Sequence, residues 1–224
     1  MSKLVSHVES CLKNTDKYIS KLNEDILNME GKSGKKNRHL YNNLCEFDKT
    51  KYLEIGSWKG SLVCSSLYNN KLSCLCIDNW SQFGGPKEEF LVNFNKYKAN
   101  NNAEFLERDC WNIDTSCIGR FNIYSYDGVY GYQYNYDALY KYYNALDDQF
   151  IFLVNNWNDE EVKNGTYKSI EDLKINILFS KLIETSNEID NNDWSNGVGI
   201  FVLEKEKLDL HLYEPSDNDV SNYL

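Results

Sequence analysis

A glycine-containing loop carries the strongest chemical signal in the chain. In YLEIGSWKG, residues 52–60, Gly56 and Gly60 stand where a predicted strand passes into a predicted helix at Ser61. Glycine lets a backbone approach a ligand closely, and the free N–H groups at the start of a helix bind carboxylates. The loop therefore predicts a binding site for a small ligand, with a plain strand-to-helix turn as the alternative.

The spacing of the glycines argues against two common nucleotide sites. A dinucleotide loop, GxGxxG, needs a glycine two residues after Gly56, where Trp58 stands. A P-loop that ended in the GKS of residues 31–33 would need a glycine at the position of Ile26. A dinucleotide oxidoreductase and a P-loop NTPase are therefore both disfavoured.

Acidic residues end the next two predicted strands. Asp78 follows the glycine loop by about 20 residues, a position where a carboxylate can bind both hydroxyls of a ribose. The third strand ends in Asp109, Cys110 and Trp111, where a polar group can meet an adenine amine and an indole can lie against the purine. A solvated strand end is the alternative for Asp109.

Apolar runs of strand length alternate with helical stretches from residue 51 onward. We predict strands at 51–56, 72–78, 103–109, 121–127, 149–157, 177–184 and 198–205. Helices are predicted at 61–68, 88–98, 134–144 and 167–174. This alternation is typical of a mainly parallel sheet that is covered on both faces. The last two strands leave no room for a helix, so we expect an antiparallel pair with a turn at residues 191–197.

The N-terminal region is predicted to be helical and to cover a ligand site. Apolar residues recur at three- and four-residue spacings over residues 3–29, which predicts one amphipathic helix that Gly31 ends. A polar loop and a short helix near His39 follow. The long helix could pack on its own sheet or on a second subunit of a homodimer, and we favour its own sheet.

Composition excludes several classes of protein. The 224 residues carry a formal net charge of −10 and no basic stretch longer than residues 32–38, so nucleic acid is disfavoured as a partner. No stretch approaches the ~20 apolar residues of a membrane span, and the seven cysteines lack paired metal spacing. These features predict a cytoplasmic protein, in a host cytoplasm if the asparagine-rich chain is encoded by a large DNA virus.

Four motifs together resemble the class I methyltransferases that use S-adenosylmethionine (SAM), in particular their small-molecule O-methyltransferase branch. The motifs are EIGSWKG, IDNWSQFGGPKEEF, YDG and a strand ending in NNW, and the resemblance covers about residues 31–205. It implies an α/β fold, a Rossmann-like three-layer sandwich with a seven-stranded, mostly parallel sheet whose last strand is antiparallel, plus an N-terminal helical segment. We expect one domain, 1–224, with N-terminal helices and a cofactor-covering loop at 1–49, the core at 50–205 and a tail at 206–224.

The resemblance places the cofactor at the ends of the first three strands. Trp80 is among the residues implied near the adenine, and for it a position in the core or at the rim of the site is an equal alternative. The residues implied are Glu54, Gly56, Ser57 and Gly60 around the methionine part of SAM, Asp78 and Asn79 at the ribose, and Asp109, Cys110, Trp111 and Trp80 near the adenine.

In similar metal-dependent O-methyltransferases, an acid after the fourth strand binds a divalent ion together with a pair of residues at the end of the fifth. Asp127 and the pair Asn155 and Asn156 occupy these positions. An amide keeps an oxygen ligand but removes one negative charge, so we expect weak binding of Mg²⁺.

The proton acceptor is a second departure from the family pattern. Relatives carry a His or Lys three residues after the acid, where this chain has Tyr130. An ordinary tyrosine has a pKa of about 10, so it needs a nearby cation to act as a base. His39 is the rival base, with a structural or solvated histidine as the alternative, and Asp127 is a third proton acceptor.

We expect an O-methyltransferase acting on a small hydroxylated acceptor, with a sugar or nucleotide sugar as the acceptor class. The competing hypothesis is a SAM-binding domain that has lost its chemistry and serves as a scaffold or partner subunit, which the departures at Tyr130 and Asn155 support. Residues assigned to the acceptor are Arg38, Tyr132, Trp157 and Trp194. For Trp194 a plain surface turn is the alternative.

Overall fold

The chain folds around one central β-sheet. The computed structural model describes residues 2–186 and 194–206. Strands β1 to β5 pair in parallel in the order β3-β2-β1-β4-β5, and β7 lies antiparallel between β5 and β6. This confirms the predicted seven-stranded, mostly parallel sheet with an antiparallel last strand. The strands are β1 (Lys51–Ile55), β2 (Ser73–Asp78), β3 (Asn102–Glu107), β4 (Phe121–Tyr126), β5 (Leu146–Asn155), β6 (Asn176–Ile183) and β7 (Val198–Glu204).

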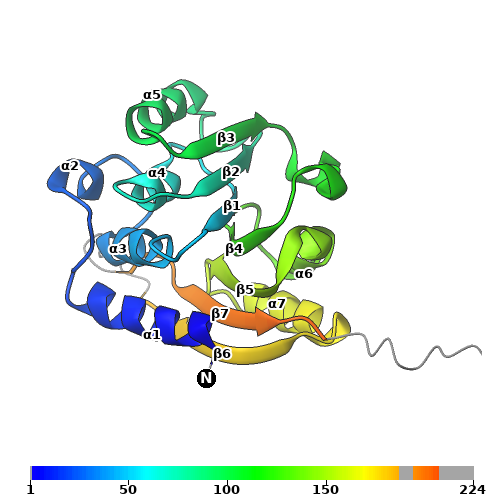
Figure 1. Ribbon diagram of the computed structural model, residues 1–224. Coiled ribbons are helices and arrows are strands. Elements are labelled where there is room, and N and C mark those ends of the chain that lie inside the picture. Colours follow the sequence, from blue (N-terminus) through cyan, green and yellow to red (C-terminus); the bar gives the residue numbers. More distant parts are fainter. Residues whose placement is uncertain (1, 187–193, 207–224) are drawn as a thin grey trace, which may run out of the picture.

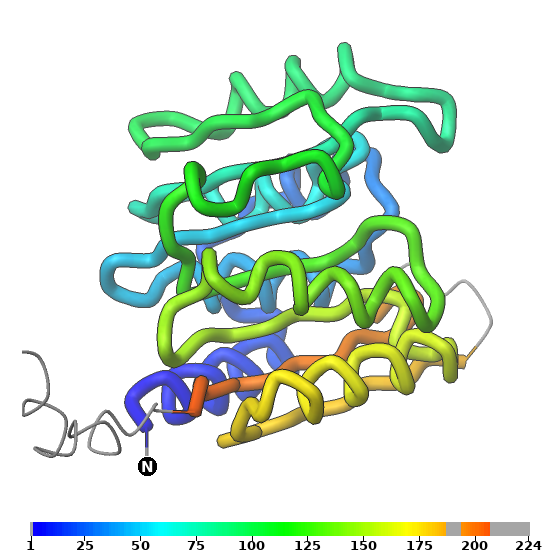
Figure 2. Tube along the Cα trace, turned by 90° about the vertical axis from the view of Figure 1, so that its right-hand side faces the viewer, coloured from blue at the N-terminus to red at the C-terminus, as the bar shows by residue number. Residues whose placement is uncertain are grey.

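Helices cover both faces of the sheet and complete a three-layer sandwich. Helices α1 to α5 lie on one face and α6 and α7 on the other (Figure 1). Figure 2 shows α6 and α7 in front of the strands. Among the described residues, no helix has the length and apolar character that crossing a bilayer requires. The helices are α1 (Lys3–Asp16), α2 (Glu24–Leu27), α3 (Lys35–Leu44), α4 (Ser61–Leu67), α5 (Lys87–Tyr97), α6 (Tyr132–Tyr142) and α7 (Glu160–Asp172), with 3-10 turns η1 (Cys110–Asn112), η2 (Thr115–Cys117) and η3 (Tyr143–Ala145).

Alternate residues of each central strand enter two separate hydrophobic cores. On β1, Tyr52 packs with the helices of the first face, whereas Leu53 and Ile55 pack with α6 and α7. Because both faces are buried, the central strands are nearly continuous apolar runs. Such runs were readily predicted, and the packing on both sides holds the carboxyl ends of the strands in place.

The N-terminal region contains two helices rather than the single predicted helix over residues 3–29. Helix α1 ends at Asp16, Tyr18 adopts a left-handed φ of 55°, and the Asn23 side chain caps α2. Gly31 lies beyond α2 and ends no helix. As favoured from the sequence, α1 packs on its own domain, against α3 and the β5 and β7 strands.

Two buried asparagines of α3 explain why the N-terminal helix is interrupted. The Asn43 side chain donates to the Ile19 carbonyl at 2.9 Å, and the Asn42 side chain accepts from the Lys21 N–H at 2.9 Å. These bonds satisfy backbone groups that a continuous helix would have paired internally. The interruption therefore depends on a contact between segments far apart in sequence.

Helix α7 begins at Glu160 rather than at the predicted residue 167. Asp159 caps it by accepting from the Glu161 N–H, and acidic residues in the first turn stabilise the positive end of the helix dipole. The predicted turn at 191–197 lies partly outside the described residues, as does the tail at 206–224. Within the described part of that turn, Asn196 and Gly197 both have positive φ.

Candidate functional site

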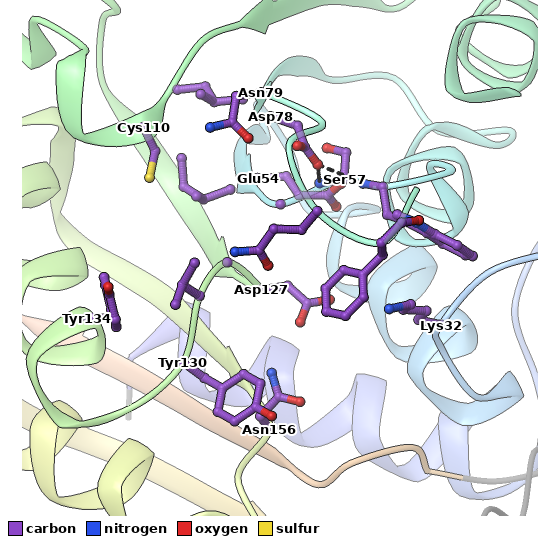
Figure 3. A pocket seen from close by; sticks show the side chains of 18 of the residues that line it. Lys32, Glu54, Ser57, Asp78, Asn79, Cys110, Asp127, Tyr130, Tyr134 and Asn156 are labelled. Carbon is purple, nitrogen blue, oxygen red and sulfur yellow. Dashed lines mark hydrogen bonds between the residues drawn. The ribbon is translucent and has the colours of Figure 1, made fainter. Parts of the chain in front are cut away.

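A cleft of about 1000 Å³ opens at the carboxyl ends of the central strands. Its lining comes from the segment before α3 and from the loops that follow β1, β2, β3, β4 and β5 (Figure 3). The cleft spans the point between β1 and β4 where the strand order reverses. Ligands of open α/β sheets bind at this point, because the loops on either side diverge there.

Gly56 brings the β1–α4 loop against the β4–α6 loop. Its φ is +85°, and a Cβ atom at this position would lie 2.2 Å from the Asp127 carbonyl oxygen. The Asp127 N–H donates to the Ile55 carbonyl at 2.9 Å. The glycine therefore allows two loops to touch, and this contact places Asp127 beside the glycine loop.

The Asp78 carboxylate joins two loops of the cleft. One oxygen accepts from the N–H groups of Ser57 and Trp58, each at 2.8 Å, and the other accepts from the Trp80 N–H at 2.7 Å. Trp58 and Trp80 have left-handed φ angles of 47° and 49°. Such angles are uncommon for bulky residues and persist where surrounding bonds hold them. Asp78 thus fixes the shape of this side of the cleft and keeps one lone pair free for a ligand hydroxyl.

Glu54 lies at the floor of the cleft and is fully buried. Burial raises its pKa to about 7, although the Tyr52 hydroxyl donates to its Oε2 and opposes the rise. Among the described residues, Glu54 Oε1 and the nearby Ser57 hydroxyl have no hydrogen-bond partner. Buried polar atoms without partners are rare, so this pair indicates a place for a polar or cationic ligand group.

Asp127 points into the centre of the cleft (Figure 3). Burial, followed by the negative charges of Glu54 and Asp78, raises its pKa to about 8, while the positive charge of Lys32 opposes the rise. A carboxylate with a pKa near neutrality accepts a proton more readily than an ordinary aspartate. Asp127 therefore has both the position and the basicity of a proton acceptor.

The charges around the cleft favour a cationic ligand. Carboxylates outnumber cations in the described lining, because Lys32 and Arg108 are its only basic residues. A concave site of one sign concentrates ligands of the opposite sign. The acidic residues of the lining are Glu54, Asp78, Asp109, Asp127 and Asp159.

The predicted adenine end is built around η1. Asp109, Cys110 and Trp111 all line the cleft, and the Asp109 side chain caps the turn by accepting from the Trp111 N–H at 2.9 Å. The Trp111 ring lies 6.2 Å from the Tyr134 ring, between centroids. Burial raises the pKa of the Cys110 thiol to about 12, so the thiol is neutral. The arrangement offers a mostly uncharged aromatic wall.

Three further cofactor predictions have different outcomes in the structure. Trp80 lines the cleft and also packs on Phe90, so it belongs to both cleft and core. Asn79 lines the cleft, with its side-chain oxygen accepting from Ser81. Gly60 does not line the cleft. With a φ of +86° it is the N-cap of α4, and a side chain there would meet Phe90.

The predicted metal ligands do not come together. Asn156 lines the cleft, but the Asn155 side chain donates to the Tyr41 hydroxyl at 3.0 Å in the protein interior. Adjacent residues at a strand end point in opposite directions, so only one of the two can face the cleft. The described residues also contain no group of three or more His, Cys, Asp or Glu side chains that could hold a metal ion.

The two rival bases are placed differently. Tyr130 lies at the cleft and is 54% exposed. His39 does not line the cleft, because it is buried on α3, where its Nδ1 shares a 2.7 Å hydrogen bond with the Ser20 hydroxyl. Burial, together with the charge of Lys35, lowers the pKa of His39. The catalytic prediction for His39 is therefore not supported by its position.

We expect His39→Ala to affect stability rather than chemistry. Loss of a buried ring and its hydrogen bond should cost about 1–3 kcal/mol of unfolding free energy. Affinity for SAM should stay within about twofold. Thermal denaturation and SAM titration of the variant test this. A large loss of methyl transfer at an unchanged melting temperature would restore His39 as a catalytic candidate.

None of the residues predicted to bind the acceptor lines the cleft. Arg38 is buried and donates to the carbonyls of Ile26, Leu27, Met29 and Ser33, which holds the segment before α3. Trp157 is fully buried against Phe201, Tyr132 starts α6, and Trp194 packs on the first core. The acceptor predictions relied on residue type and, for Arg38, on a resemblance of its segment, and neither reveals which way a side chain points.

Several cleft residues were not predicted from the sequence. They include Lys32, Phe83, Arg108, Tyr134, Asn158 and Asn196. A polar loop that could cover a ligand was expected from Gly31 onward, so a lysine in that loop was a signal for Lys32. The remaining residues come from loops whose course depends on the fold.

Comparisons with known proteins identify the fold. No protein-family profile and no curated protein matches the sequence. An O-methyltransferase from Bacillus cereus, solved with S-adenosylhomocysteine (SAH), matches with a TM-score of 0.55 and 13% identity over 89% of this chain and 91% of that chain. An SAH-bound methyltransferase from Podospora anserina matches with a TM-score of 0.53 and 15% identity over 92% and 89%.

A proposed SAM-dependent methyltransferase from Streptococcus mutans also matches, with a TM-score of 0.55 and 12% identity over 75% of this chain. The chain spans about half of that protein, 48% of its length. Together with the strand order and the cleft, these matches show that the chain has the class I SAM-dependent methyltransferase fold.

Proposed function

We propose that this protein is a SAM-dependent O-methyltransferase acting on a small hydroxylated acceptor. The observation that carries the proposal is the placement of Asp127, a carboxylate with a pKa of about 8, beside the glycine loop in the cleft. A methyl donor and a hydroxyl could meet there next to a proton acceptor. Fold alone does not determine function, so the proposal depends on this site.

The residues of the cleft fit SAM. The unpartnered Glu54 Oε1 and Ser57 hydroxyl would receive the methionine part, and Asp78 would accept from the ribose. The wall of Cys110 and Trp111 would border the adenine. SAM carries a positively charged sulfonium, which the acidic lining favours.

When bound, SAM would supply a methyl group activated by the sulfonium. The acceptor oxygen would take the methyl group, SAH would be the leaving group, and Asp127 would take the hydroxyl proton. Positioning dominates such displacements, because holding the two reactants in line removes most of the entropic cost. The cleft walls supply that positioning.

A sugar or nucleotide sugar is the proposed acceptor class. Tyr130 offers an aromatic ring on the same side of the cleft as Asn156, which offers an amide (Figure 3). Aromatic faces pack on the apolar face of a sugar, and amides bond its hydroxyls. The net charge of −10 disfavours a nucleic acid acceptor.

The affinity for SAM is expected to increase with pH more steeply than the affinity for SAH. Glu54 and Asp127, with pKa values of about 7 and 8, lose their protons between about pH 6 and 9, and the resulting charges attract the sulfonium that SAH lacks. Over this pH range we expect the affinity for SAM to increase about tenfold more than the affinity for SAH. Isothermal titration of both ligands over this range tests it.

Asp78→Ala is the control for the site, because it should weaken the binding of both SAM and SAH about 100-fold. Parallel pH profiles for SAM and SAH would contradict the placement of the sulfonium near the two carboxylates. Binding without methyl transfer to any acceptor would favour the alternative of a SAM-binding scaffold. Absence of binding would refute the proposed function.

A further inference from the structure

We propose that the ammonium of Lys32 takes the place of a divalent metal ion: it binds the acceptor oxygen beside Asp127, so that methyl transfer needs no metal. The inference rests on the proposed function and adds a catalytic residue to it. Lys32 comes from the segment before α3, far in sequence from the loop that carries Asp127.

Lys32 and Asp127 extend into the same cleft from different sides (Figure 3). The Lys32 Nζ lies 3.0 Å from the centroid of the Phe83 ring and 5.2 Å from that of Trp58. Within the described chain, Nζ makes no hydrogen bond or ion pair. Its N–H groups are therefore available to a ligand, while the aromatic rings limit where the ammonium can lie.

The backbone around Lys32 is held from several directions. Its carbonyl accepts from the Ser195 hydroxyl at 3.2 Å, and the same hydroxyl accepts from the Gly34 N–H at 3.0 Å. The neighbouring Ser33 bonds to Ser61 at 2.8 Å and to Arg38. These bonds fix the backbone from which the Lys32 side chain extends, and the contacts of Nζ with Phe83 and Trp58 direct the ammonium.

The charges of Lys32 and Asp127 act on each other. Lys32 is the cation that opposes the rise in the pKa of Asp127. Desolvation lowers the pKa of Lys32, and Asp127 opposes that change. Each group thus favours the charged form of the other.

The same residues are a poor binding site for a divalent metal ion. Asn155 is directed to Tyr41, which leaves Asp127 and Asn156 as the predicted ligands at the cleft. Mg²⁺ prefers several oxygen ligands with carboxylate charge. The Lys32 ammonium at the same cleft would also repel a dication.

The proposed division of roles accounts for both departures from the family pattern. Lys32 donates a hydrogen bond to the acceptor oxygen and stabilises its developing negative charge, while Asp127 receives the hydroxyl proton. The amide pair at Asn155 and Asn156 then needs no metal-binding role. Tyr130 likewise needs no role as a base and can pack on the acceptor.

Methyl transfer from tritiated SAM tests the inference, with methyl glucopyranoside, UDP-glucose and catechol as acceptors. Lys32→Met should lower kcat about 100-fold and leave the Kd for SAM within about threefold. Lys32→Arg, which keeps the charge, should retain activity within about tenfold. Lys71→Met, a matched change at an exposed lysine outside the cleft, should behave as the wild type.

The wild-type rate should be the same with EDTA and with added Mg²⁺. A rate abolished by EDTA and restored by Mg²⁺, or a Lys32→Met variant as active as the wild type, overturns the role of Lys32 but leaves the proposed function standing. A wild-type protein that binds SAM and methylates none of the acceptors refutes the proposed function, and the inference with it.

Discussion

The Asp127→Asn variant is expected to lose about 1000-fold in methyl transfer while its ligand-free form becomes more stable. The loss follows because an amide cannot accept the hydroxyl proton. The gain in stability follows because burial and the negative charges of Glu54 and Asp78 make the Asp127 carboxylate costly to ionise. Function and stability should therefore change in opposite directions at one residue.

The stability change has a defined dependence on pH. The pKa of Asp127 is about 8 in the folded protein and near its ordinary value of 3.8 in the unfolded chain. Between about pH 4 and 8 the unfolded chain is ionised and the folded protein is not, so the free energy of unfolding falls as pH rises through this range. Asparagine removes that effect. The stabilisation should thus grow up to about pH 8 and then level off.

Thermal denaturation at several pH values, with the methyl-transfer assay, tests this prediction. Because Asp127 is partly exposed to the cleft, we expect a gain of about 1 kcal/mol at pH 8, or about 2–4 °C in Tm. Asp48→Asn is the control, since it removes an exposed carboxylate outside the cleft. Retention of full activity by Asp127→Asn would exclude Asp127 as the proton acceptor.

Gly56→Ala is expected to be the most destabilising single methyl group that can be added at the cleft. The φ of +85° is unfavourable for alanine, and the new Cβ would lie 2.2 Å from the Asp127 carbonyl oxygen. The hydrogen bond from the Asp127 N–H to the Ile55 carbonyl, 2.9 Å long, opposes separation of the two loops. We expect a loss of about 4 kcal/mol or more, a fall of about 10 °C in Tm and loss of SAM binding.

Gly84→Ala separates the cost of the left-handed backbone from the cost of the close contact with the Asp127 loop. Gly84 has almost the same φ, +84°, but a Cβ there would have no atom within 4 Å. Its replacement should cost only about 1 kcal/mol, the price of the left-handed backbone. Guanidinium denaturation of both variants measures the difference. Equal losses would mean that the contact with the Asp127 loop contributes little to stability.

Local sequence patterns were sufficient to predict most of the architecture. Every predicted strand from residue 51 onward is present, because strands buried on both faces read as apolar runs. The glycine loop at Gly56 and the acid at Asp78 were also found from spacing alone. Both act within a strand-loop-helix unit, so their geometry depends on residues close in sequence.

Contacts between distant segments decided the rest of the site. Asn155 and Asn156 are identical and adjacent, yet the first bonds Tyr41 in the interior and the second, with a positive φ of 59°, faces the cleft. His39 and Arg38 were assigned to the site because their segment resembles one that lines the pocket in similar proteins, whereas their partners on neighbouring segments make them structural.

The sequence by itself determined the sheet, the helices that cover it from residue 61 onward and the glycine loop at the cleft, because these follow from hydrophobic periodicity and from short-range backbone geometry. Only the tertiary structure decided where the N-terminal helix breaks, through Asn42 and Asn43, and which cation lies close enough to Asp127 to lower its pKa. Those features depend on side chains that meet across long separations in sequence, and no local pattern specifies which way a side chain points or what it meets.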